Sequence, residues 1–213
     1  AAFPAYSIFS EERGLIDKQS EYTFYIDPLD GTYNFVLGLP YFSVSIGLFK
    51  NKKAQMGVVY NPILKNFYYA IRGQGAFLNG APISVNQEKT FSKATFSSAC
   101  GWKIGHAYHA SLYHEFYKKN LGRFIIMWSP AMDLCLLACG KTEAMLAKKI
   151  ELHDFAAGKL IAQEAGARLT DFFGRPEADD TNNAFVASNG TKLHDEVVAI
   201  LKKITKKFGS RNL

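Results

Sequence analysis

Cysteine is scarce in this chain, with three residues among 213, and all three lie in apolar stretches. A small, odd number excludes a disulfide framework, and we expect Cys100, Cys135 and Cys139 to be reduced, buried thiols of a cytoplasmic protein. We recognise neither a signal peptide nor an apolar run long enough to cross a bilayer, so we expect no membrane association. Repeats, low-complexity tracts and long linkers are also lacking, which leaves a globular domain as the class to consider.

Hydrophobic residues make up 48% of the chain, enough to bury one sizeable core, and we expect a single domain over residues 1–213. Residues 1–100 read mostly as strands, whereas strands alternate with helices over residues 101–213. This order predicts an α/β fold in which mixed sheets are layered with helices. The expected strands span 22–26, 42–49, 55–60, 67–71, 123–127, 143–147 and 184–188, and the expected helices span 107–120, 130–139, 154–165 and 190–207.

Lysine is concentrated near the end of the chain, in a sequence whose formal net charge is +6. Valine, leucine and isoleucine recur at helical spacing from Val197 to Ile204, which is typical of an amphipathic helix. We therefore interpret the positive charges as its solvated face and do not expect a nucleic-acid partner. The residues concerned are Lys202, Lys203, Lys206, Lys207 and Arg211.

Two carboxylates three residues apart carry most of the chemical information. Asp27 and Asp30 follow an aromatic and β-branched run over residues 22–26, and Pro28 between them interrupts a regular strand because it has no N–H to donate. A turn of this kind directs both carboxylates and the Leu29 carbonyl toward one point. Oxygen ligands of this type are those that Mg²⁺ prefers, so the segment predicts a magnesium site.

The two residues after this turn are candidates for contact with a phosphate group. Gly31 and Thr32 offer backbone N–H groups, and Thr32 adds a hydroxyl, beside any metal that the aspartates hold. Short motifs match often by chance, however, and a solvated acidic turn at the end of a strand is the alternative interpretation.

A longer string favours the metal site. Residues 27–35 read D-P-L-D-G-T-Y-N-F, which resembles the signature of the inositol monophosphatase family, metal-dependent phosphatases of sugars and inositols with a layered α/β fold. Residues 9–12 are similar to the G-E-E segment of that family, residues 72–80 to its K-G-x-G-A-F-x-N-G hairpin, and residues 153–158 to its W-D-x-A-A-G motif. The resemblance covers nearly the whole chain.

The resemblance implies a cofactor, a set of site residues and a kind of partner. It implies two or three Mg²⁺ ions, held by Glu11, Asp27, the Leu29 carbonyl, Asp30 and Asp154. It implies Glu11, Thr32 and Asp30 as catalytic residues, and Gly31 and Thr32 as phosphate-binding residues. A small phosphate monoester and a second copy of the chain, in a homodimer, are the implied partners. Asp154 alone would indicate no more than an acid at a helix start.

His153 stands where the family motif has tryptophan. A histidine beside a carboxylate can act as a general base or a metal ligand. No second histidine or cysteine lies at ligand spacing from it, so we expect His153 to fill the space of the tryptophan.

The residues at 147–149 bear on the substrate. Inositol-specific members of the family have a glutamate seven residues before the motif aspartate, and this position is Ala147 here. An alanine accepts no hydroxyl hydrogen bond, whereas Lys148 and Lys149 are able to meet a second phosphate. We therefore name Ala147 and Lys148 as candidate substrate contacts, with fructose 1,6-bisphosphate as one substrate, and the alternative is that the lysines face solvent.

Family members carry two helices ahead of the segment at residues 9–12, and an acidic residue in them helps the threonine to activate water. The sequence opens ten residues before Glu11, so we expect a fold that lacks these helices. A fragment, a different route to activated water and an impaired enzyme all remain open. The alternative function is thus a phosphatase-like protein that no longer catalyses and binds a protein or RNA partner.

Overall fold

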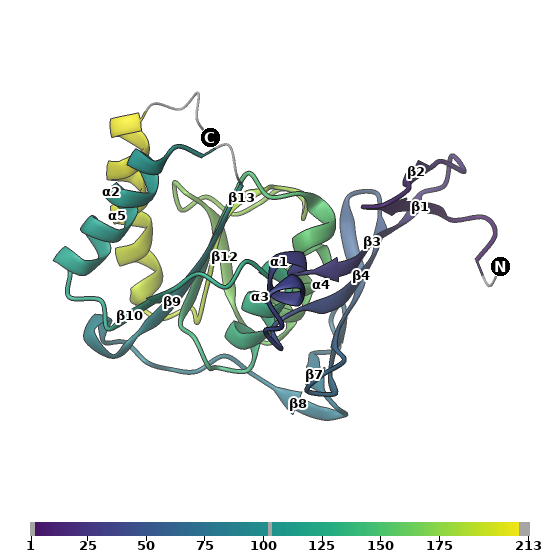
Figure 1. Ribbon diagram of the computed structural model, residues 1–213, viewed down its shortest axis with the longest axis horizontal. Helices are drawn as coiled ribbons and strands as arrows, with labels where there is room; N and C mark the ends of the chain where they lie inside the picture. The colour runs from purple at the N-terminus through teal and green to yellow at the C-terminus, as the bar shows by residue number, and fades with distance from the viewer. Residues whose placement is uncertain (1–2, 102–103, 209–213) are drawn as a thin grey trace.

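Four layers form the molecule in the computed structural model, which describes residues 3–101 and 104–208. Helices α2 (His106–Lys118) and α5 (Leu193–Phe208) form the first layer, and a five-stranded sheet forms the second. Helices α3 (Pro130–Ala138) and α4 (Leu152–Glu164) lie between this sheet and an eight-stranded sheet (Figure 1). This architecture confirms the expected layered α/β fold.

The eight-stranded sheet has the order β2-β1-β3-β4-β5-β6-β7-β8 and is antiparallel except where β1 pairs with β3. Side chains alternate between its two faces, as strand geometry requires. In β6, Tyr68 and Ala70 are buried with α3 and α4, whereas Phe67 and Ile71 lie on the other face and are exposed. The strands are β1 (Ser7–Ser10), β2 (Gly14–Ile16), β3 (Tyr22–Asp30), β4 (Ser43–Lys50), β5 (Lys53–Asn61), β6 (Asn66–Ile71), β7 (Ala76–Leu78) and β8 (Ala81–Ile83).

The five-stranded sheet has the order β10-β9-β11-β13-β12, parallel over its first three strands and antiparallel over the rest. One face packs on α2 and α5 through Phe96, Leu146 and Val186, and the other packs on α3 and α4 through Ala147 and Phe185. The strands are β9 (Thr95–Cys100), β10 (Arg123–Ile125), β11 (Ala144–Lys148), β12 (Arg168–Asp171) and β13 (Ala184–Ser188).

The sequence predicted the long elements better than the short ones. All four expected helices are present, each with ends within three residues of the expected ones. The strand expected to end at Ile26 continues as β3 to Asp30, because a register shift between Asp27 and Asp30 accommodates Pro28. We did not expect β1, β2, β12 or the short helix α1 (Thr32–Val36), which are too short to show a clear period.

All three cysteines are free, and Cys100 and Cys135 are buried as expected, whereas Cys139 is only partly buried. Among the described residues, no helix has the length and apolar character that a membrane span requires.

The C-terminal helix is amphipathic, as expected. Leu201 and Ile204 are buried on α5, and Lys203 on its polar face forms an ion pair with Glu115 of α2 at 2.7 Å. Arg211, the last member of the lysine-rich segment, lies outside the described residues.

Small residues let α4 approach the eight-stranded sheet closely. A Cβ atom at Gly57 of β5 would lie 2.6 Å from the carbonyl oxygen of Ala157, closer than side chains tolerate. A Cβ at Gly47 of β4 would lie 3.0 Å from the Cβ of Ala156. Ala156 and Ala157 therefore seat the beginning of α4 directly on the sheet, while Gly158 faces Ala131 and Leu134 of α3, and these contacts fix where Asp154 lies.

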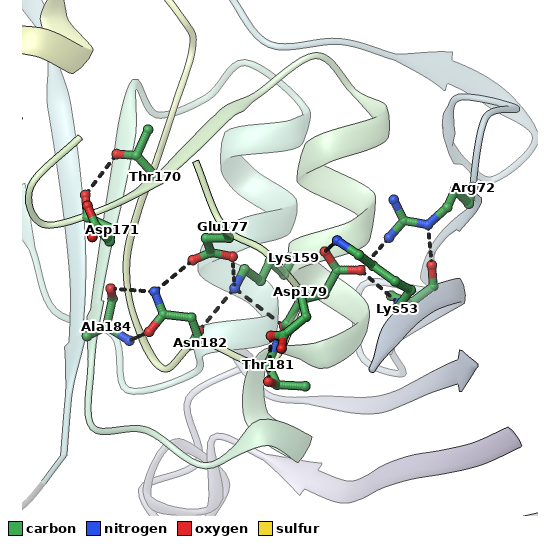
Figure 2. Close-up of polar contacts among 12 residues, drawn as sticks. Lys53, Arg72, Lys159, Thr170, Asp171, Glu177, Asp179, Thr181, Asn182 and Ala184 are labelled. Carbon is green, nitrogen blue, oxygen red and sulfur yellow. Dashed lines mark hydrogen bonds and ion pairs between the residues drawn. The ribbon is translucent and has the colours of Figure 1, made fainter. Parts of the chain in front are cut away.

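A cluster of charged groups holds the middle of α4 (Figure 2). Lys159 is 2% exposed, and its Nζ lies 2.6 Å from Glu177 Oε2 and 3.0 Å from the carbonyl oxygen of Asn182. Nearby, Asp180 accepts a hydrogen bond from Arg72 at 2.5 Å. Burial lowers the pKa of Lys159 and raises the pKa of Glu177, and the attraction between the two charges opposes both shifts. We call Lys159, Glu177, Asp180 and Arg72 the charge-pair cluster.

Candidate metal centre

A cavity of about 710 Å³ opens where β1 and β3 end and α4 begins. All the residues that the sequence assigned to metal, phosphate or catalysis line it, and they come from both halves of the chain. They are Glu11, Asp27, Leu29, Asp30, Gly31, Thr32 and Asp154. The structure thus brings the whole candidate set together, and the role of each residue stays a prediction.

Glu11 reaches this cavity because β1 and β3 are parallel. Ser10, the last residue of β1, pairs with Ile26, and the N–H of Glu11 donates to the Ile26 carbonyl at 3.2 Å. Glu11 and Asp27 are therefore the next residues along neighbouring strands. One carboxylate oxygen of each and a ring nitrogen of His153 all lie within 4.8 Å of one another, a spacing that suits a shared metal ion.

The register shift in β3 directs both aspartates inward. Asp27 is 2% exposed, and its Oδ1 accepts a hydrogen bond from the Leu29 N–H at 2.8 Å. Asp30 is 3% exposed, and its Oδ2 accepts hydrogen bonds from Ser129 Oγ at 2.5 Å and from Ser43 Oγ at 3.3 Å. These bonds fix the two carboxylates, as a metal site needs its ligands fixed by surrounding groups.

The G-T pair forms the turn from β3 into α1. Gly31 has a φ of +87°, and a Cβ there would lie 3.0 Å from the Tyr41 carbonyl oxygen, so the position requires glycine. The Thr32 hydroxyl donates to the Leu29 carbonyl at 2.9 Å. The hydroxyl is thus held at the cavity, next to a carbonyl that the sequence named as a ligand.

Asp154 lies in the first turn of α4 and has two contacts. Its Oδ2 accepts a hydrogen bond from the N–H of Glu151 at 3.0 Å, and its Oδ1 lies 3.1 Å from Nε2 of His153. The His153 ring stacks on Phe9, with ring centroids 5.6 Å apart, which agrees with a space-filling role. Its Nδ1 is buried with no hydrogen-bond partner in the described part of the chain. The sequence analysis missed that His153 also offers a nitrogen to the acids.

We call Glu11, Asp27, Asp30 and Asp154 the acid cluster. Burial, together with the charges of Glu11 and Asp154, raises the pKa of Asp27 to about 7, against the opposing Leu29 hydrogen bond. Burial also raises the pKa of Asp30 well above its usual range. Burial alone would lower the pKa of His153, but its hydrogen bond to Asp154 and the neighbouring carboxylate charges outweigh it and raise the pKa.

A divalent cation fits this environment. Within the described residues, 3–101 and 104–208, a member of the acid cluster makes one ion pair, the salt bridge between His153 and Asp154. Negative charge taken out of water without a nearby cation is costly, and a metal ion bound by these oxygens would remove that cost.

Comparison with known proteins identifies the relationship. The model of the inositol monophosphatase family matches residues 1–206. The chain belongs to the inositol monophosphatase family. It is 34% identical to a fructose-1,6-bisphosphatase/inositol-1-monophosphatase of Thermotoga maritima, over 98% of this chain and 78% of that protein. It is 36% identical to the Nus factor SuhB of Vibrio cholerae, over 88% of this chain and 71% of that protein. A solved Thermotoga maritima IMPase matches with a TM-score of 0.87 and 33% identity, over 98% of this chain and 78% of that one.

Membership in this metal-dependent family makes the chain a phosphoric monoester hydrolase. It also accounts for the convergence of the acid cluster on one cavity, which the motifs had led us to expect.

The two residues named as substrate contacts lie away from the cavity of this phosphatase. Ala147 packs in the core between the sheets, and alternation along β11 places Lys148 on the opposite face, where its Nζ lies 3.7 Å from the centre of the Tyr108 ring. Burial lowers the pKa of Lys148 to about 8. Lys149 does line the cavity, as does Asn183, whose carbonyl accepts the Lys149 N–H at 2.8 Å. Lys149 is therefore better placed than Lys148 for substrate contact.

Ser129 is a further group of this phosphatase that the sequence did not reveal. It is fully buried directly before α3, and its hydroxyl contacts Asp30 from 99 positions further along the chain. No local pattern marks a contact of this range, because it depends on how α3 packs beside β3.

Proposed function

We propose that the chain hydrolyses phosphate monoesters of small polyols or sugars, with Mg²⁺ held at the acid cluster. One observation carries this proposal: four carboxylates and the Leu29 carbonyl line one cavity, and Asp27 and Asp30 are buried there with raised pKa values. The names of relatives from Thermotoga maritima and Pyrococcus furiosus, which refer to fructose 1,6-bisphosphate or inositol 1-phosphate, support the class of substrate.

The acid cluster and the Leu29 carbonyl would hold two or three ions. When bound, Mg²⁺ lowers the pKa of a bound water and neutralises charge on the transferring phosphoryl group. His153 adds a nitrogen beside Glu11 and Asp27, and Ser129 keeps Asp30 oriented toward the cavity.

The chain's own groups then position the reactants. Thr32 orients the attacking water through its hydroxyl, which the Leu29 carbonyl holds in place. The carboxylate of Glu11, which is exposed at the cavity, accepts the proton that the water loses. The backbone N–H groups of Gly31 and Thr32 bind the phosphate, and no covalent bond between enzyme and phosphate forms.

Phosphate release from a panel of esters tests the proposal. Inositol 1-phosphate, fructose 1,6-bisphosphate and glycerol 2-phosphate are incubated with the chain in Mg²⁺, and then in EDTA. We expect release that EDTA abolishes and that Asp154→Asn reduces by orders of magnitude. Asp195→Asn is the matched control, since it makes the same change in the first turn of α5, where the side chain is 69% exposed. Release that persists in EDTA would overturn the metal-dependent mechanism.

One relative is named Nus factor SuhB, so we retain the alternative function, a phosphatase-like protein that binds a protein or RNA partner. If no ester releases phosphate in Mg²⁺ and the chain binds RNA in a salt-sensitive way, that alternative would be favoured.

A further inference from the structure

Two serine side chains hold Asp30, one from each of two segments. Ser43 Oγ, at the start of β4, and Ser129 Oγ, directly before α3, both donate to Asp30 Oδ2, at 3.3 and 2.5 Å. These two bonds share one carboxylate oxygen and do not use Oδ1, which leaves Oδ1 for a cation. Ser43 and Ser129 are far apart in the sequence, so any contact that joins their segments also helps to orient Asp30.

A hydrogen bond outside the cavity joins the same two segments. Tyr41, two residues before Ser43, donates its hydroxyl to Oδ1 of Asp133 at 2.7 Å. Asp133 is fully buried in the first turn of α3, and its N–H donates to the Ser129 carbonyl at 2.9 Å. The contacts therefore form a closed ring that starts and ends at Asp30. We call Tyr41 and Asp133 the tyrosine–aspartate pair, and neither is among the described residues that line the cavity.

The backbone of Tyr41 also lies against the turn to which we assign phosphate binding. The Tyr41 carbonyl accepts a hydrogen bond from Nδ2 of Asn34, in α1, at 2.7 Å. A Cβ atom at Gly31 would lie 3.0 Å from the same carbonyl oxygen, so the turn and residue 41 are in close contact. Helices α1 and α3 lie side by side (Figure 1), and the tyrosine–aspartate pair ties the segment after α1 to α3. A displacement of Tyr41 would therefore move the N–H groups of Gly31 and Thr32.

We propose that the tyrosine–aspartate pair is a positioning element of this phosphatase, which holds Asp30 and the turn at residues 31–32 in the geometry that binds cation and phosphate. This inference rests on the proposed function and adds two residues that touch neither the substrate nor the metal. The hydrogen bond does the positioning, because it fixes the segment at Tyr41 against α3, and the charge of Asp133 is not needed for that. Groups that orient metal ligands from behind are commonly worth about 10–100-fold in metal affinity or activity.

A double variant separates positioning from stability. Tyr41→Phe/Asp133→Leu removes the hydrogen bond, and Leu branches at Cγ as Asp does, while Phe vacates the volume of the hydroxyl. Replacing both partners of a hydrogen bond by apolar groups of similar shape changes stability little, so the metal-free Tm should stay close to that of the wild type. Mn²⁺, titrated by calorimetry, should bind at least about tenfold more weakly, and kcat/KM for inositol 1-phosphate should fall by at least about tenfold. Wild-type metal affinity in this variant would overturn the inference.

A conservative variant tests whether the hydrogen bond carries the effect. Asp133→Asn removes the charge and keeps an oxygen that accepts the Tyr41 hydroxyl, so Mn²⁺ affinity and kcat/KM should remain close to those of the wild type. Tyr41→Phe alone should lose as much as the double variant, and these single changes decide the question if the double variant does not fold. A loss in Asp133→Asn as large as in Tyr41→Phe would overturn the inference, because the charge would then be responsible.

Tyr68→Phe is the matched control. Tyr68 is buried on β6, its hydroxyl accepts a hydrogen bond from Nδ2 of Asn66 at 3.2 Å, and it is not among the described residues that line the cavity. The change removes a tyrosine hydroxyl that is not part of the ring of contacts around Asp30, so metal affinity should equal that of the wild type. A loss as large as in Tyr41→Phe would overturn the inference, since the position of the missing hydroxyl would then not matter.

Hydrogen exchange separates failure of this inference from failure of the proposed function. In the metal-free protein, the amides of residues 29–35 should exchange faster in Tyr41→Phe than in the wild type or Asp133→Asn, because the turn is held less firmly. This measurement needs neither substrate nor metal. If the wild type releases no phosphate in Mg²⁺, the proposed function fails, and faster exchange in Tyr41→Phe would still support the positioning role. Equal exchange in the three proteins would overturn that role whether or not the chain is an active phosphatase.

Discussion

Helix α4 carries two buried groups of charge within two turns, and they are arranged in opposite ways. At its beginning, Asp154 joins three other carboxylates, with His153 as the one ion-pair partner in the described chain. Further along, Lys159 pairs with Glu177 at 2.6 Å, and Asp180 pairs with Arg72 (Figure 2). The charge-pair cluster balances its own charge, whereas the acid cluster sets four carboxylates against one ion-pair partner, His153, within the residues that the structure describes.

This difference separates the charge-pair cluster, which holds the helix in place, from the proposed metal site on the same helix. Opposite charges that neutralise each other hold α4 to the loop before β13. Burial, and to a smaller extent the like charges that share the cavity, raise the pKa of Asp27, and such buried acids destabilise the fold unless a cation binds. The comparison predicts that changes in the acid cluster reduce activity and leave the fold intact, whereas changes in the charge-pair cluster do the reverse.

The largest expected effect is on catalysis. Asp154→Asn should lower kcat/KM by about three orders of magnitude, because it removes a ligand charge that acts on the transition state. The free energy of unfolding without metal should stay the same or rise, since Asn still accepts the Glu151 N–H and one like charge is gone. Steady-state kinetics and thermal unfolding measure the two quantities, and turnover near wild type would remove Asp154 from the metal set.

The next effect is on stability and sharpens the contrast. Lys159→Met leaves Glu177 buried without its partner and should cost about 3–5 kcal/mol of unfolding free energy. The double variant Lys159→Met/Glu177→Leu should recover most of this loss, because an apolar pair of similar volume replaces both charges. Urea unfolding measures both, and a single variant as stable as wild type would show that the pair does not hold α4.

The pH dependence of metal-free stability should differ between wild type and Asp27→Asn. The pKa of Asp27 is raised from 3.8 to about 7 on folding, so the folded state binds the extra proton between these values. Wild-type stability should therefore fall, relative to the variant, as pH rises from about 4 to 7. The difference between wild type and variant removes the contribution of groups that titrate in both proteins. One of them is His194, whose pKa is lowered to about 4 by burial.

Mg²⁺ should reverse the loss of wild-type stability relative to Asp27→Asn at high pH, since the metal binds the ionised acids. Thermal unfolding at pH 8 should show a rise in Tm with Mg²⁺ for wild type and little rise for Asp27→Asn. A difference between the two proteins that does not vary with pH would show that the burial of Asp27 carries no charge cost.

The smallest effect belongs to the outer part of the charge-pair cluster. The Arg72 side chain is 31% exposed, so water screens its pair with Asp180. Arg72→Ala should cost about 1 kcal/mol of unfolding free energy, well below Lys159→Met. An equal cost for the two variants would mean that burial does not set the strength of these pairs.

The sequence was sufficient to name residues that the structure brings together, and insufficient for the geometry that brings them together. The spacing of Asp27 and Asp30, and the resemblance of residues 153–158 to the family motif for Asp154, named three residues that line one cavity. The position of Glu11 depends on the parallel pairing of β1 with β3, and β1 is four residues long with no clear alternation. Ser129 contacts Asp30 from 99 positions away, so only the assembled fold could show it.

The direction in which a side chain points was the other property that the sequence did not predict. The sequence placed Lys148 near the substrate because of its distance from Asp154 along the chain. Alternation along β11 turns it to Tyr108, and Lys149, after the strand has ended, is the lysine at the cavity. A shift of one residue exchanges the two faces of a strand, so sequence distance alone could not decide between them.

Metal binding measured by isothermal titration calorimetry tests the central claim most directly. Mg²⁺, and Mn²⁺ as a second probe, are titrated into the wild type, into Asp154→Asn and into the double variant Lys159→Met/Glu177→Leu. The account predicts that the double variant binds metal as the wild type does and that Asp154→Asn binds at least about tenfold more weakly. Equal affinity in the wild type and Asp154→Asn would contradict it, because the acid cluster would then not be the site that the cation completes.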